Sequence, residues 1–127
     1  MYIYFNEING RNYVYGYGSE LEENSIEVPS VPEEIDKYLS CYYVVDDRYI
    51  LDEKRKEWVE LQWSTERELN EINRWFAWYD EQCIQYQRAM RLGLEFNRDI
   101  NELDAEAVSK ATRIKELRAF LETPYVW

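Results

Sequence analysis

Apolar and polar positions change their period near residue 52, and this change divides the chain into two parts. Before it, aromatic and β-branched residues come in short clusters separated by turn-forming residues, which is typical of strands. After it, apolar residues recur at alternating steps of four and three among charged helix formers. The sequence therefore predicts an α+β fold, with a small antiparallel β-rich unit over residues 1–53 and a long, coiled-coil-like helical hairpin over residues 54–127.

The β-rich part predicts two hairpins. Residues 1–5 and 13–17 are rich in tyrosine and β-branched side chains, and Asn-Gly at residues 9–10 supplies the positive φ values of a type I′ turn. Residues 40–51 hold two further short strands, with two aspartates at residues 46–47 as the turn between them. These four segments together favour an antiparallel sheet.

Smaller features of the same part refine this picture. Gly16 and Gly18 are expected to mark a bulge or the end of a strand, since glycine in a strand often does so. Residues 25–28 predict one more short strand. Pro32 is expected to open a single helical turn that ends near Tyr38, because proline fits the first position of a helix.

One long helix is predicted from Asp52 to about Leu92, a stretch without proline or glycine. Gly93 is expected to end it in the left-handed conformation that glycine tolerates. The helix carries a seam with an average spacing of about 3.5 residues, the period of a coiled coil. Its members are Trp58, Gln62, Thr65, Leu69, Ile72, Phe76, Tyr79, Cys83, Tyr86 and Met90.

A second helix is predicted over residues 103–122, capped by Asn101 or Asp104. Phe96 and Ile100, in the connection before it, are expected to pack inward. Two such helices with a short connection form an antiparallel hairpin. The stripe of the second helix is Leu103, Ala107, Lys110, Ile114, Leu117 and Leu121, and the apolar C-terminal Tyr125, Val126 and Trp127 that follow are expected to be covered.

More aromatic residues gather on the first helix than a single hairpin requires. Trp75 and Trp78 lie beside the main seam, and two glutamines continue their face. A helix that is apolar on two faces usually has two partners, so the second is either the β-rich unit or a neighbouring subunit. We therefore predict a protein–protein interface formed by Trp75, Phe76, Trp78, Tyr79, Gln82, Gln85, Tyr86 and Arg88.

Charge and composition narrow the possible functions. The chain has 15 basic and 26 acidic residues and a net charge of −11, so we expect it to bind neither nucleic acid nor an anionic membrane. Histidine is absent, which removes the Ser-His-Asp triad and the commonest zinc ligand. No phosphate-binding, zinc-protease or calcium-loop motif occurs. We expect a non-enzymatic protein with no catalytic residue, no metal and no cofactor.

The two cysteines and the N-terminus bear on the compartment. Cys41 and Cys83 have no CxxC spacing and fit reduced, buried thiols better than a disulfide framework. The N-terminus lacks both a basic segment and a long apolar segment, so it does not predict a secretory signal. We therefore expect a protein that is not secreted.

Residues 75–93 follow the pattern WFxWYDxQxxQYxRxxRLG, and DINxLD follows at residues 99–104. This pattern resembles the C-terminal part of small tail- or baseplate-associated proteins of siphophages that infect Gram-positive bacteria. The strand, Asn-Gly turn and tyrosine-rich hairpins of the N-terminal half also look like those proteins. The resemblance implies a structural or assembly protein, located in the virion tail or in the host cytoplasm during assembly, that contacts other phage tail proteins.

Self-association through the aromatic helix is the mechanism that this resemblance favours. Analogy with the threefold symmetry of phage fibre and receptor-binding components suggests a trimer. An alternative belongs to another class of protein. Residues 1–50 carry ten acidic and three basic residues, a balance of −7, and such a surface can imitate nucleic acid. A small acidic phage-encoded inhibitor that binds a basic host protein, of the anti-defence type, would use that surface.

Overall fold

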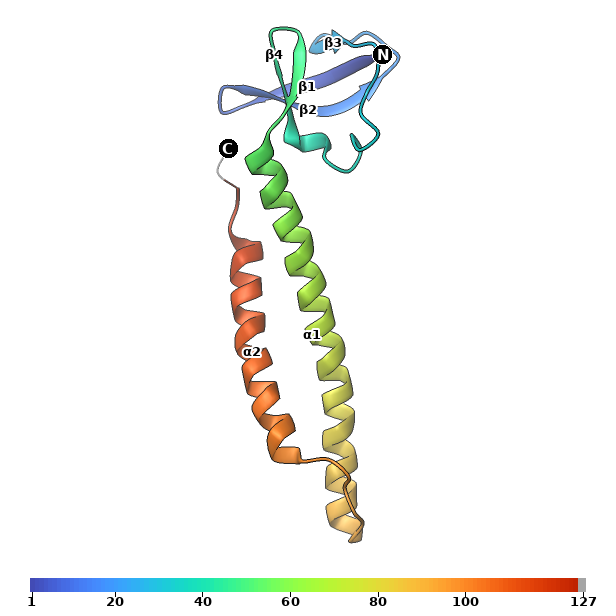
Figure 1. Cartoon of the computed structure of the whole chain (residues 1–127), viewed down its shortest axis with the longest axis vertical. Helices are drawn as coiled ribbons and strands as arrows, with labels where there is room; N and C mark the ends of the chain where they lie inside the picture. The colour runs from blue at the N-terminus through green and yellow to red at the C-terminus, as the bar shows by residue number, and fades with distance from the viewer. Residues whose placement is uncertain (126–127) are drawn as a thin grey trace. The chain divides into compact units, whose positions relative to one another are not determined.

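The computed structural model describes residues 1–125 and divides into two compact units. The first holds Met1–Glu60 together with Tyr125, and the second holds Leu61–Pro124. A five-stranded antiparallel sheet followed by two helices confirms the predicted α+β class (Figure 1). The predicted division after residue 53 falls where the long helix begins, about two turns before the units separate. The expected covering of Val126 and Trp127 lies outside the described residues.

The sheet has the strand order β3-β1-β2-β4-β5. Both predicted hairpins are confirmed, and positive φ values at Asn9 (49°) and Gly10 (83°) form the first turn. Asp46 (51°) and Asp47 (60°) form the second, because aspartate also tolerates this conformation. The strands are β1 (Tyr2–Ile8), β2 (Arg11–Gly18), β3 (Ser25–Glu27), β4 (Tyr42–Val45) and β5 (Arg48–Leu51).

A bulge interrupts the pairing of β1 with β2, as the glycines of β2 suggested. Tyr4 lies opposite Gly16 and Phe5 lies opposite Val14, so Tyr15 is the additional residue. The bulge thus falls beside Gly16, and Gly18 ends the strand. It lets the strand bend without breaking the sheet.

The core of the first unit lies between the sheet and the segment that precedes β4. Ile3 and Val14 from the sheet, and Ile35 and Cys41 from that segment, are almost completely buried. The helical turn predicted from Pro32 to Tyr38 is present as isolated hydrogen-bonded turns and not as a continuous helix. The N–H of Ile35 donates to the carbonyl of Pro32 at 3.1 Å, and the N–H of Tyr38 donates to that of Glu34 at 3.2 Å. The one helical element there is the 3₁₀-helix η1 (Leu39–Cys41). An isolated helical turn gains too few hydrogen bonds to be stable, so packing decides its conformation.

Tyr38 predicts how the first unit responds to alkaline pH. Its hydroxyl donates a hydrogen bond of 2.7 Å to Oε1 of Glu60, and this bond raises the pKa of Tyr38 to about 12. Because the folded pKa lies above the ordinary value of 10.0, this stabilisation is complete below pH 10 and is lost as the pH approaches 12. The difference in tyrosinate absorbance between the wild type and Tyr38→Phe should titrate near pH 12. A midpoint near 10 would contradict the expected bond.

The long helix α1 (Glu53–Leu92) starts and ends as the sequence predicts. Asp52 caps its start, since Oδ1 accepts a hydrogen bond from the backbone N–H of Arg55. Gly93 follows its end with a φ of 69°, and the N–H of Leu94 donates to the carbonyl of Ala89 at 2.8 Å. The left-handed Gly93 and this hydrogen bond together form a Schellman motif, which satisfies carbonyls that the helix end would leave free.

The second helix α2 (Ile100–Glu122) begins three residues earlier than predicted. Its cap is Asp99, and the predicted caps Asn101 and Asp104 are wrong. The Asp99 carboxylate accepts from the backbone N–H of Asn101 (2.9 Å) and Glu102 (3.4 Å), so the helix can start at Ile100. α2 runs antiparallel beside α1, and the connection returns along the last turns of α1 (Figure 1).

Candidate protein interface

The predicted seams of α1 and α2 face each other within the second unit. Thr65 and Ile72 of α1 are buried, as are Leu103 and Leu117 of α2. The buried seam does not extend to its last predicted member, because Met90 is 65% exposed. α2 does not accompany the last turns of α1, and the connection covers the neighbouring Ala89 instead. The antiparallel helical hairpin is thus present, whereas its coiled-coil character stays a prediction.

Two polar links join the helices across the seam. Nε and Nη2 of Arg113 donate to the two carboxylate oxygens of Glu68 at 2.8 and 2.9 Å, and this pairing lowers the pKa of Glu68. The hydroxyl of Tyr79 donates to Oδ1 of Asp104 at 2.5 Å, which raises the pKa of Tyr79. Together the two links hold α1 and α2 at one alignment.

Four aromatic residues in the middle of α1 form one cluster around Trp75. The Trp75 ring stacks on Tyr79 with centroids 5.2 Å apart, and its other neighbours are Phe76 at 5.1 Å and Trp78 at 6.1 Å. Lys110 of α2 places its ammonium group 5.1 Å from the centroid of Trp75. Most of this cluster is therefore half-buried and has a partner inside the hairpin.

The eight residues of the predicted interface separate into two groups. Trp75, Phe76 and Tyr79 pack inside the hairpin, Gln82 is buried, and Tyr86 packs edge-on against Phe96 of the connection. A second group remains accessible to a partner: Trp78, which is 36% exposed, and the exposed residues Gln85 and Arg88. If these side chains bind another protein, they do so at the end of the hairpin.

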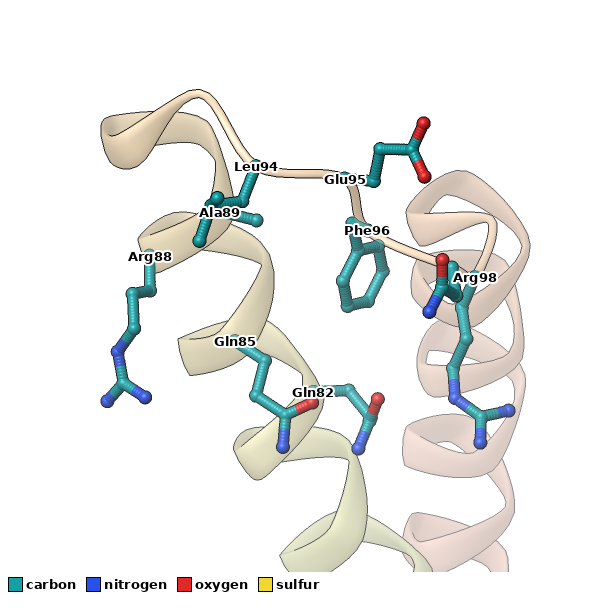
Figure 2. Close-up of a pocket in the computed structure, with 9 residues that line it drawn as sticks. Gln82, Gln85, Arg88, Ala89, Leu94, Glu95, Phe96 and Arg98 are labelled. Carbon is teal, nitrogen blue, oxygen red and sulfur yellow. The ribbon is translucent and has the colours of Figure 1, made fainter.

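A groove opens at that end, where the connection passes back over α1 (Figure 2). Its volume is about 560 Å³. Arg88 and Arg98 stand at opposite edges, with the carboxamides of Gln82 and Gln85 between them and the ring of Phe96 above. We call it the hairpin groove, and it is lined by Gln82, Gln85, Arg88, Ala89, Leu94, Glu95, Phe96, Asn97 and Arg98.

The hairpin groove offers hydrogen-bond donors that the described residues leave unused. Neither Arg88 nor Arg98 forms an ion pair with a carboxylate in the part of the chain that the structure describes. The Arg98 guanidinium lies 5.0 Å from the centroid of Trp78, and such stacking leaves its N–H groups accessible at the edge. Gln82 is only 7% exposed, but its carboxamide is not among the buried polar atoms and faces the groove without a hydrogen bond in residues 1–125. It is therefore a further donor and acceptor that a ligand can bond.

Only part of the hairpin groove could be predicted from the sequence. It identified Gln82, Gln85 and Arg88 through the aromatic helix, and it placed Phe96 inward. It missed Arg98, because a residue in an irregular connection belongs to no periodic pattern. The Arg98–Trp78 contact depends on how the connection folds back, which no local signal encodes.

A second groove, in the first unit, is lined by side chains that already pair with one another. It has a volume of about 540 Å³ and includes Arg11, Tyr13 and Asp52. The Asp52 carboxylate accepts hydrogen bonds from the Tyr13 hydroxyl (3.2 Å) and from Nη1 of Arg11 (3.5 Å). Arg55 lies over the rings of Tyr13 and Tyr125, so the cluster fastens the C-terminal segment. We interpret this cluster as structural.

Residues 1–125 contain no group of three or more histidine, cysteine, aspartate or glutamate residues that could hold a metal ion. Neither helix in that range combines the length and apolar character needed to cross a membrane.

Comparison with known proteins adds no relative. No protein family, no curated protein and no solved structure matches this chain. The functional conclusion must therefore come from the residues and their geometry.

Proposed function

We propose that this protein is a non-enzymatic structural or assembly protein of a phage tail, and that it self-associates through the end of its helical hairpin. The observation that carries this proposal is the hairpin groove. It gathers three residues of the predicted interface, Gln82, Gln85 and Arg88, and adds Phe96 and Arg98. Aromatic and arginine side chains are enriched in protein interfaces, and they supply most of the binding energy there.

Exposed apolar side chains near the end of the hairpin support the same proposal. Ile84, Met90, Leu92 and Leu94 are all exposed there, and Leu94 lines the hairpin groove. Exposed apolar surface is unfavourable in water and often marks a site of association. The phage tail assignment itself depends on the resemblance of residues 75–104 to siphophage tail proteins, and a trimer remains the expected state.

The proposal predicts the effect of replacing Trp78 with alanine. Loss of the indole removes an exposed aromatic contact and the surface on which Arg98 stacks. We expect Trp78→Ala to weaken self-association by at least about tenfold, while helix content stays the same. Light scattering on a sizing column, which resolves multiples of 15.6 kDa, measures the effect.

A matched variant controls for the general loss of apolar surface. Val108→Ala also shortens an exposed apolar side chain, on the other helix and outside the groove lining. It should leave the mass unchanged. A wild-type protein that stays at 15.6 kDa at every concentration would contradict self-association.

A second candidate function has one observation in its favour. The first unit carries exposed acidic residues in three separate turns, including Glu33, Glu34, Asp46 and Asp47. An acidic inhibitor of a basic host protein would use such a surface. Capture of a basic host nuclease or polymerase, lost as the salt concentration rises, would favour this function over the structural one.

A further inference from the structure

An acidic loop in the first unit exposes one large apolar side chain. We define this acidic loop as residues 19–24, all of which are exposed. Leu21 is 74% exposed and is flanked by Glu20, Glu22 and Glu23. The loop therefore exposes an apolar side chain among negatively charged ones. No feature of the first unit accounts for a leucine at this position.

Hydrogen bonds from its neighbours hold the acidic loop in place. The Tyr4 hydroxyl donates to the carbonyl of Glu20 at 2.6 Å. The Ser25 hydroxyl donates to the carbonyl of Glu22 at 2.6 Å and accepts from its N–H at 3.3 Å. These bonds use the loop backbone and leave the glutamate side chains free. A loop ordered in advance loses little conformational entropy when it binds.

The hairpin groove has the complementary character. Its lining contains two arginines, Arg88 and Arg98, and one acidic residue, Glu95, which gives a local charge of +1 in a chain of −11. Leu94 is exposed beside Phe96 and supplies apolar surface. Opposite charges around an apolar contact favour docking of the one element on the other.

We propose that the acidic loop of one copy docks into the hairpin groove of a second copy. Leu21 packs against Phe96 and Leu94, while glutamates of the loop pair with Arg88 and Arg98. The carboxamide of Gln82, which faces the groove, bonds a backbone group of the loop. This inference rests on the self-association proposed above and names the surfaces that carry it.

The proposed contact joins two different surfaces, so each copy offers one acidic loop and one hairpin groove. Such a contact is heterologous, and it forms a closed ring if the rotation between copies closes and a filament if it does not. The trimer expected from the resemblance would then be a ring of three identical contacts.

Reversing the groove charges tests the contact. We expect Arg88→Glu combined with Arg98→Glu to raise the protein concentration at half-association by at least about tenfold. The control is Arg67→Glu with Arg74→Glu, which changes the net charge equally at two exposed positions of α1 outside the groove. The control variant should associate more tightly than the groove variant. Circular dichroism of each variant checks that both helices remain folded.

Reversing the loop charges completes the test. Glu22→Arg with Glu23→Arg should weaken association as the groove variant does, whereas all four reversals in one chain should restore it, because the charges are again opposite. An oligomeric wild type whose groove variant keeps its mass would overturn the docking and leave self-association standing. Failure of the four-fold variant to regain mass would also overturn it. A wild type that is monomeric at every concentration would instead contradict the proposed function.

Discussion

Replacing Trp75 with alanine is expected to lower the free energy of unfolding by about 2–4 kcal/mol, the largest effect of any single substitution in the hairpin. The indole stacks on Tyr79, contacts Phe76 and lies under the ammonium group of Lys110. Its loss would leave a space between α1 and α2 that neighbouring side chains cannot fill. Urea unfolding followed by far-ultraviolet circular dichroism, which reports helix content, measures this change.

The matched variant for this prediction is Trp78→Ala. Trp78 belongs to the same cluster but is more exposed, so its removal should cost less stability, about 1 kcal/mol. The two substitutions should therefore have different effects. Trp75→Ala mainly lowers the stability of the fold, and Trp78→Ala mainly weakens self-association. Equal losses of stability would show that Trp75 does not hold the hairpin together.

A comparable loss, about 3 kcal/mol, is expected for Ile3→Ala in the first unit. Ile3 is completely buried on β1, between its cross-strand partners Tyr17 on β2 and Ile26 on β3. Removal of its side chain leaves a cavity in a small core. Hydrogen exchange at the amides of β1 and β2 should accelerate strongly. Ile50→Ala, on the exposed part of β5, should change exchange little, and a similar acceleration there would contradict the predicted core.

The elements of the fold were predictable because each has a local signal. Asn9-Gly10 and Asp46-Asp47 adopt the positive φ values that tight turns need, and Gly93 ends α1 in the left-handed conformation. The heptad seam placed Thr65 and Ile72 on the buried face. Such signals depend on a few neighbouring residues, so they can be recognised without knowledge of the tertiary structure.

The predictions that differ from the structure concern segments in which several local conformations compete. Three acidic or amide residues near the start of α2 can each cap a helix, and Asp99 prevails because its carboxylate reaches two free N–H groups. Pro32 favours a helical start, and the segment there forms hydrogen-bonded turns that do not continue into a helix. Met90 follows the seam period but lies beyond the reach of α2.

The candidate site was predictable only in its helical part. The surplus of aromatic residues drew attention to α1, but it did not separate Trp75, which has partners in the hairpin, from Trp78, which is exposed. That distinction depends on α2 and the connection. Arg98 enters the groove through a chain reversal that has no periodic signature.

The two polar links across the hairpin also favour one alignment of the helices. A heptad seam is nearly the same after a shift of seven residues, so apolar packing alone discriminates weakly between registers. Such a shift would place Arg113 opposite Leu61 or Trp75 in place of Glu68, and a charge-paired guanidinium would lose its carboxylate. Both side chains are partly exposed, at 47% and 41%, and Arg113 keeps its pairing with Glu116, so the loss costs only about 0–1 kcal/mol. The Glu68–Arg113 pair therefore adds a small preference for the observed register.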